Sequence, residues 1–401
     1  MTALATGLRE EALAARAAGE PLRAIRAWRR LLDGAPDEWA LGLELKQDLR
    51  AVGIYPDSDP RFRRAAAALP DERWIEHYGF FYTLHGGSLD GLEARARRLL
   101  EHMDDRRLHV ILADVALHRR DWAAAERAFA AAVPLMAAEA LRAAPVPLYA
   151  AFNRRPWPET GPTYGVHVIN LDRNTGRLAL FEQAFARSGA PWRRLPAVEG
   201  VRLAAPAVQL LVGDAAAPRG TLGCFLSHVA AWEAVLAGDE ACGLILEDDT
   251  IPLLDLPARL GGLNLPEGWD IVWVNDRMEP RREDRPEFFA QPLATVLARF
   301  EPEHNAPGGD GYLLSREGAR KLLEWVAVDG MADDVDWRMV TYCLSPADVA
   351  AIPPHVVARR LYLERLGPAI PRVERLAAYA LHPALIRTVG VDSDREDDNR
   401  L

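Results

Sequence analysis

An apolar run followed directly by three acids is the feature that most constrains this fold. Gly243–Leu246 is too short for a helix and is typical of a buried, parallel strand. Glu247, Asp248 and Asp249 then emerge at its carboxyl end, where open α/β sheets bind ligands. Adjacent carboxylates repel one another and are best tolerated where a cation is held, and such oxygen ligands suit Mg²⁺ or Mn²⁺. The alternative is a solvated strand end whose acids cap the next segment.

The flanking sequence adds a helix and another strand. Residues 221–236 carry apolar side chains close to a helical repeat, which predicts a helix packed on the strand. Residues 164–171 form another apolar strand, and Arg173 and Arg177 follow it. Arginines in a strand-to-helix turn suit the binding of a diphosphate, although surface ion pairs explain either residue almost as well.

Several short blocks along residues 163 to 345 occur in a recognisable order. They are Ile169–Arg173 with Arg177, Arg194–Gly200, Gly223–Cys224, Ser227–His228 with Trp232, Leu246–Asp249, Gly311–Ser315 with Ala319, and Asp336 with Met339. In order and spacing they resemble glycosyltransferase family 25, the lipooligosaccharide and collagen galactosyltransferase-like group. Glu199–Gly200 departs from the family's more frequent Asp-Gly. The acid-rich residues 333–336 leave open which Asp fills the family's downstream acidic position.

The resemblance implies a GT-A-like, Rossmann-like sheet that binds a UDP-sugar, with galactose or glucose as the sugar and Mn²⁺ or Mg²⁺ as the cation. In that fold the acidic triplet is the metal and nucleotide motif. We expect Asp249 and Glu247 to hold the metal and Asp248 or Glu247 to contact metal or ribose. Residues alternate in direction along an extended chain, so Glu247 and Asp249 should point one way and Asp248 the other.

Further residues are candidates for the nucleotide pocket. The resemblance and the turn chemistry together point to Asn170, Arg173, Arg177, Ser227 and His228. A nucleophilic serine is rejected, because adjacent residues on a helix point about 100 degrees apart and no Gly-x-Ser-x-Gly loop is present. For His228 the alternative is packing against the sheet.

Transfer of a sugar to a hydroxyl requires a general base opposite the leaving group. The downstream acid resembles the base of inverting GT-A-type transferases, and Asp336 is the main candidate, with Asp334 as the second. Asp333 also competes, and capping of a helix is the alternative role for Asp333 or Asp334.

Composition excludes several classes of protein. The 401 residues exceed one usual core, and the net charge of -10 argues against a nucleic-acid partner. Cys224, Cys242 and Cys343 are too few and too scattered for a disulfide framework. Lys46 and Lys321 are the only lysines, which is typical of a GC-rich, bacterial genome. We find no signal peptide or transmembrane segment and expect a cytoplasmic protein.

The first part of the chain has a different amino-acid composition and is rich in Ala, Leu and Arg. Ala24–Pro36 and Asp121–Val133 superimpose at an offset of about three 34-residue repeats, which predicts a tetratricopeptide-like helical domain. We therefore expect a helical domain at 1–150, a Pro-rich linker at 151–162, the transferase domain at 163–390 and a mobile tail at 391–401.

The acceptor is left open by the sequence. The family implies either a saccharide, as in lipooligosaccharide, or a protein or peptide side chain, and helical repeats often bind peptide. Arginines alternate with apolar residues from about Pro353, so peripheral contact with a membrane also stays open. An alternative function is a non-catalytic nucleotide-binding scaffold whose helical domain binds a partner protein, and the intact acidic triplet argues against it.

Overall fold

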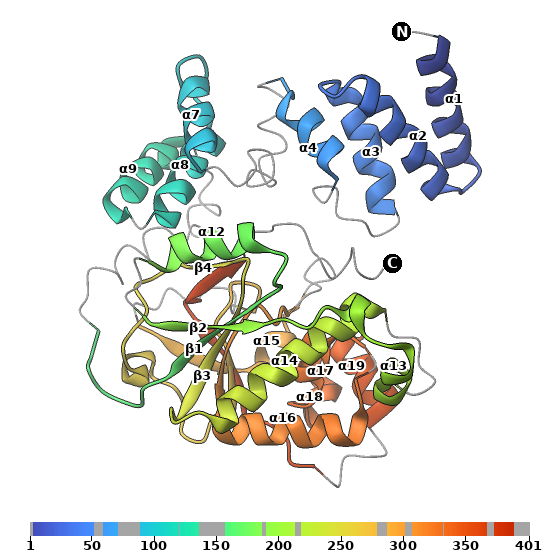
Figure 1. Ribbon diagram of the computed structural model, residues 1–401. Helices are drawn as coiled ribbons and strands as arrows, with labels where there is room; N and C mark the ends of the chain where they lie inside the picture. Colours follow the sequence, from blue (N-terminus) through green and yellow to red (C-terminus); the bar gives the residue numbers. More distant parts are fainter. Residues whose placement is uncertain are drawn as a thin grey trace. The chain divides into compact units, whose positions relative to one another are not determined.

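A computed structural model gives the fold of this chain (Figure 1). It describes residues 3–51, 59–70, 89–119, 121–135, 157–186, 190–212, 218–278, 287–300, 307–331, 333–366 and 373–388. The chain divides into two compact units, one made chiefly of Met1–Ala116 and Ala123–Leu141 and the other chiefly of Arg142–Val389. The predicted tail and half of the predicted linker lie outside the described residues. The bounds predicted for both therefore stay a prediction.

The first unit is all helical in its described part. Its elements are α1 (Ala3–Ala17), α2 (Pro21–Gly34), α3 (Trp39–Ala51), α4 (Pro60–Ala67), α7 (Leu89–Leu100), α8 (Arg106–His118), α9 (Trp122–Ala132) and the 3₁₀ turn η3 (Val133–Leu135). The two stretches that share the repeat pattern form α2 and α9. Helical structure is thus confirmed, while the tetratricopeptide-like character stays a prediction.

A buried polar network joins the first three helices. The Trp28 indole donates to Asp48 at 2.6 Å, and Arg16 Nε donates to the same carboxylate at 2.7 Å. The Arg16 guanidinium also lies over the Trp28 ring, 5.5 Å from its centroid. Because Asp48 is buried, both partners are needed to offset the loss of its hydration.

The second unit is built on a mixed seven-stranded sheet in the order β2-β1-β3-β7-β5-β8-β6. The strands are β1 (Gly165–Asn170), β2 (Trp192–Pro196), β3 (Cys242–Glu247), β5 (Ile271–Trp273), β6 (Phe289–Pro292), β7 (Gly311–Ser315) and β8 (Ala378–His382). A separate antiparallel pair is formed by β4 (Thr250–Pro252) and β9 (Ile386–Thr388). The sheet confirms the α/β class; its GT-A character stays a prediction.

The pairing of β3, an interior strand of the sheet, corrects one detail of the sequence prediction. It is parallel to β1 but antiparallel to β7, so it is a parallel strand on one side only. Neighbouring strands on both sides explain why its run is continuously apolar, since every residue from 242 to 246 is buried.

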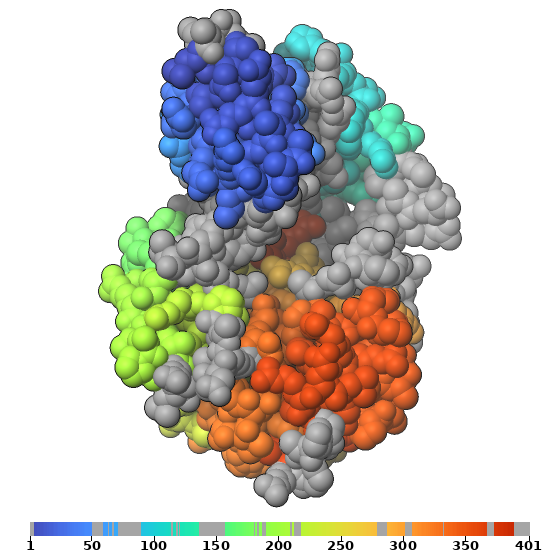
Figure 2. Space-filling model, turned by 90° about the vertical axis from the view of Figure 1, so that its right-hand side faces the viewer, coloured from blue at the N-terminus to red at the C-terminus, as the bar shows by residue number. Residues whose placement is uncertain are grey.

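Helices and turns complete this unit. They are α12 (Thr175–Phe185), η4 (Gly200–Arg202), α13 (Ala205–Val212), α14 (Arg219–Ala237), η5 (Leu260–Leu263), α15 (Leu293–Leu297), α16 (Arg316–Asp329), α17 (Val335–Thr341), α18 (Pro346–Ala351), α19 (Val357–Leu361) and the π turn η6 (Tyr362–Leu366). The predicted helix at 221–236 is α14, which packs on α16, α17 and the strands β1, β2, β3 and β7. Figure 2 shows residues near 200–230 in yellow-green beside the orange C-terminal helices on one face of this unit.

Within the described part of the chain, α14 is the one helix long and apolar enough to cross a membrane. Half of that apolar window is buried, and its residues Phe225, Ala231 and Trp232 belong to the main hydrophobic core. These contacts are those of a core helix.

Close backbone packing joins α14 to η4. A Cβ on Gly223 would lie 2.5 Å from the Val198 carbonyl oxygen and 2.6 Å from the Gly200 nitrogen. Both are backbone atoms, which cannot turn away as a flexible side chain would. The contact therefore requires glycine at position 223.

We expect Gly223→Ala to destabilise the α/β unit by about 1–3 kcal/mol through overpacking, measured by urea unfolding. Gly176→Ala is the matched control, since a Cβ there meets nothing within 4 Å. Equal free energies of unfolding for the two variants would show that η4 can move away from α14 without loss of stability.

Candidate functional site

The acidic triplet lies at the carboxyl end of β3. Glu247 ends the strand, and its backbone N–H donates to the Asp310 carbonyl oxygen at 3.2 Å. Asp248 is buried, whereas Glu247 and Asp249 are half-buried. The three carboxylates do not share one environment, because each faces different partners.

Asp248 is bound by residues of the neighbouring strand and helix. Asn170, the last residue of β1, donates its amide to Asp248 Oδ2 at 2.6 Å, and Arg177 of α12 lies 2.5 Å from Oδ1. Arg194 of β2 in turn donates to Asn170 Oδ1 at 2.7 Å. Burial raises the pKa of Asp248 to about 7, against the lowering effect of Arg177. Asn170, Arg177 and Asp248 are thus brought together as one connected group.

Asp249 follows at the turn into β4. Its Oδ2 lies 3.4 Å from Arg177, so that guanidinium bridges both aspartates. Burial raises the pKa of Asp249, and the charge of Arg177 opposes the rise. Its Oδ1 is buried and has no hydrogen-bond partner among the described residues. An oxygen in that position is suited to accept a ligand.

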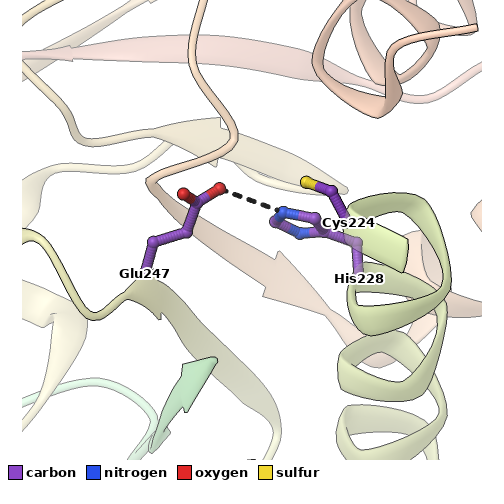
Figure 3. A group of neighbouring side chains, drawn as sticks. All are labelled: Cys224, His228 and Glu247. Atoms are coloured by element: carbon purple, nitrogen blue, oxygen red, sulfur yellow. Dashed lines mark hydrogen bonds and ion pairs between the residues drawn. The ribbon is translucent and has the colours of Figure 1, made fainter. Parts of the chain in front are cut away.

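Glu247 faces the other way, toward α14 (Figure 3). Its Oε1 lies 3.3 Å from His228 Nε2, and the opposite ring nitrogen, Nδ1, lies 2.9 Å from the Tyr312 hydroxyl. Trp232 Nε1 donates to that hydroxyl at 2.8 Å. His228 is therefore fixed from two sides by β3 and β7, and it is both packed and adjacent to the acids.

Two residues that were not among the candidates from the sequence, Asp310 and Arg277, also lie at the carboxyl end of β3. Asp310, which precedes β7, accepts a hydrogen bond from Asn275 Nδ2 at 2.6 Å, and its Oδ2 lies 3.5 Å from Arg277 Nε. Burial raises the pKa of Asp310 to about 8; Arg277 lowers it, and the charges of Glu247, Asp249 and Asp336 raise it further. The sequence carries one signal for Arg277, because residues 275–277 directly follow the apolar run 271–274 and strand ends are where open α/β sheets bind ligands.

The downstream acids have three different environments. Asp334 is the N-cap of α17 and accepts the Asp336 backbone N–H at 3.1 Å, which is the capping role considered above. Asp333 is exposed and pairs with Arg365 and, at 3.6 Å, with Arg338. Only Asp336 lies near the triplet.

Gly309 marks where Asp336 meets the rest of the site. A Cβ on Gly309 would fall 2.5 Å from Asp336 Oδ1 and 3.1 Å from the His228 ring. The glycine thus allows the carboxylate and the imidazole to approach the same stretch of backbone. Asp336 also contributes to the charge around Arg277.

The two remaining candidates are bound elsewhere. Ser227 Oγ accepts the Val198 N–H at 2.8 Å and donates to the Gly223 carbonyl at 2.7 Å, so its hydroxyl holds the 197–198 segment onto α14. Arg173 lies 3.5 Å from Glu199 and keeps a third of its side chain exposed. A donor-binding role for either residue stays a prediction.

Asp310 should make stability depend on pH. The carboxyl has its ordinary pKa of 3.8 when unfolded and about 8 when folded, so the folded chain keeps a proton that the unfolded chain releases. The free energy of unfolding therefore falls as pH rises from about 4 to about 8. In EDTA, Asp310→Asn should reduce the fall between pH 5 and pH 8 by at least about 1 kcal/mol, measured by urea unfolding. The exposed control Asp172→Asn should keep the wild-type slope; equal slopes for all three proteins would contradict the assignment.

Comparison with known proteins identifies the segment that carries this site. Residues 164–256 match the profile of glycosyltransferase family 25, described as an LPS biosynthesis protein family. A protein named glycosyltransferase 25 family member from Aedes aegypti is 29% identical over 180 residues, 40% of this chain and 28% of the relative. A protein of the same name from Anopheles gambiae is 27% identical over 179 residues, 39% of this chain and 28% of the relative. The chain thus matches little more than a quarter of these relatives' length. Residues 164–256 of this chain carry a domain of glycosyltransferase family 25.

Proposed function

We propose that this chain transfers a hexose, galactose or glucose, from a UDP-sugar to an acceptor hydroxyl with inversion. The observation that carries the proposal is the group of four carboxylates, Glu247, Asp249, Asp310 and Asp336, which act on one another and on Arg277 at the end of β3. This group extends from the family 25 segment to the residue before β7 and to α17. The mutual repulsion of four carboxylates is unfavourable, and a surface that only binds a partner does not require it.

The donor atoms of this group fit a hard divalent cation, Mn²⁺ or Mg²⁺. The four carboxylates outnumber the two guanidiniums that face them, those of Arg177 and Arg277, and Asp249 Oδ1 is buried without a hydrogen bond among the described residues. Glu247 and Asp249 would hold the ion. When bound, the cation supplies charge neutralisation for the diphosphate leaving group.

The chain's own cations and amides serve the donor. Arg177 bridges Asp248 and Asp249 and has 18% of its side chain exposed, so it can turn one N–H face toward a diphosphate. Asn170 holds Asp248 and thereby the position of Arg177. Arg173 reaches the same turn from a more exposed position.

Asp336 is the proposed general base. It takes the proton of the acceptor hydroxyl as that oxygen attacks the anomeric carbon. Its position beside Gly309, rather than on β3, puts it on a different element from the acids that hold the donor. Asp334, the second candidate, is occupied as the cap of α17.

The acceptor is a saccharide or a protein or peptide side chain. The helical unit favours the polymeric alternative, because stacked helices offer extended surfaces for peptides. The competing function, a nucleotide-binding scaffold without catalysis, would retain binding but release no UDP. Incubation with a panel of UDP-sugars and Mn²⁺, with and without saccharide and peptide acceptors, distinguishes the two by UDP release.

Loss of the proposed metal ligand should abolish transfer. We expect Asp249→Asn to lower UDP release by at least about 100-fold, because the amide carries no charge to hold the cation, and EDTA should do the same to the wild-type protein. Glu324→Gln, on the outer face of α16, is the control and should keep full activity. Wild-type rates in Asp249→Asn and in EDTA would rule out metal dependence.

Loss of the proposed base should separate catalysis from binding. Asp336→Asn should leave UDP-sugar affinity within a small factor while kcat falls by about 100-fold or more. Asp334→Asn is the matched control, since asparagine caps a helix as well as aspartate does. If Asp334→Asn is inactive and Asp336→Asn is not, the base is the neighbouring acid.

A further inference from the structure

Three side chains of different chemistry converge between α14 and β3. Cys224 and His228 lie four residues apart on α14, and Glu247 ends β3. Their Sγ, imidazole nitrogen and carboxylate oxygen all lie within 4.8 Å of one another. Figure 3 shows the thiol above the imidazole and the Glu247 carboxylate turned toward the ring.

This combination of donors differs from that of the acidic group. A thiolate, an imidazole and a carboxylate suit zinc and similar transition metals, whereas Mg²⁺ and Mn²⁺ prefer oxygen ligands. Residues four apart share one face of a helix, which is the spacing that lets two ligands chelate one ion. Zinc bonds of about 2.0–2.3 Å place ligands roughly 3.5 Å apart, so small side-chain rotations close this set around an ion.

The surroundings of His228 resemble the outer shell of a metal site. A metal-bound imidazole donates its other N–H to a fixed acceptor, which orients the ring. Here Nδ1 lies 2.9 Å from the Tyr312 hydroxyl, which Trp232 already holds at 2.8 Å. A phenol oxygen has two lone pairs and can accept from both, which leaves Nε2 with a lone pair for the metal.

The site also combines rigidity with access. His228 is 1% exposed and packs against Gly309, so its ring has little freedom. Cys224 and Glu247 are half-buried, and the Glu247 side chain is 29% exposed. An ion can therefore reach the thiol and the carboxylate from solvent.

We propose that Cys224, His228 and Glu247 form a binding site for Zn²⁺ or a similar transition metal, with a fourth position open to water or a small ligand. Binding breaks the Cys224 S–H bond and forms the sulfur–metal bond, and the proton passes to solvent. The site is separate in chemistry from the proposed Mn²⁺ or Mg²⁺ site but shares Glu247 with it. Its metal affinity does not depend on whether the chain transfers sugar.

Cobalt titration of the full-length protein tests the proposal directly. Co²⁺ should bind with a stoichiometry of one and give the near-ultraviolet charge-transfer absorption of a Co²⁺–thiolate bond, and Zn²⁺ should displace it. Cys224→Ser should lose that absorption. Cys242→Ser, which also removes one thiol, is the control and should retain it. Absence of the band in wild-type protein, or its persistence in folded Cys224→Ser, would overturn the proposal.

Affinity measurements separate ligands from supporting residues. Glu247→Gln removes a proposed ligand and should weaken Zn²⁺ binding by at least about 100-fold. Tyr312→Phe removes only the hydrogen-bond partner of His228 and should weaken Zn²⁺ binding by about 10–100-fold. Circular dichroism and thermal unfolding establish that each variant is folded. Unchanged Zn²⁺ affinity in folded Glu247→Gln would show that the carboxylate is not a ligand.

A measurement on wild-type protein avoids variants altogether. Zn²⁺, but not Mg²⁺, should slow alkylation of Cys224 by iodoacetamide by at least about 10-fold, followed by peptide mass spectrometry. Alkylation of Cys224 at the same rate with and without Zn²⁺ would exclude the thiolate as a ligand.

Discussion

Burial of the Asp248 carboxylate at the end of β3 is the constraint on which the rest of the site depends. A buried charge without a partner costs several kcal/mol, so Arg177 and Asn170 must both lie against it. Those partners come from α12 and β1, and the pairing therefore fixes the first strand-to-helix turn relative to β3. Successive residues of an extended chain point to opposite sides, which turns Glu247 away from this pair and toward α14.

Much of the fold around this point could be predicted from local patterns. The strands at 164–171 and 243–246 and the helix at 221–236 follow from apolar runs and helical periodicity, and all three form where expected. The alternation argument separates Asp248 from Glu247, but it fails for Asp249, which shares Arg177 with Asp248 because residues 248 and 249 form a turn and not an extended chain. Such patterns are local because each residue's direction is set by its own backbone. The direction of pairing is not local, and β3 is accordingly antiparallel to β7, which the apolar run alone does not reveal.

The missed residues show where local patterns end. Asp310 and Arg277 are separated by a long segment, and they meet only because β7 lies between β3 and β5 in the sheet. No periodicity encodes that order. Asp334 and Asp336 differ by two positions, yet one caps α17 and the other lies beside Gly309 and His228. The sequence ranked Asp336 before Asp334 only through the family resemblance, and the start of α17 between them is what distinguishes their roles.

Glu247 lies between two kinds of donor atom, and this position links them. On one side its carboxylate reaches His228 at 3.3 Å, with Cys224 one helical turn away. On the other its charge acts on Asp249 and Asp310, both acids whose pKa is raised by burial. A nitrogen and sulfur set selects softer ions, while an all-oxygen set selects harder ones. One carboxylate cannot fully coordinate an ion in both sets at once. The orientation of the Glu247 side chain therefore decides whether the end of β3 binds a softer ion beside Cys224 and His228 or a harder ion beside Asp249.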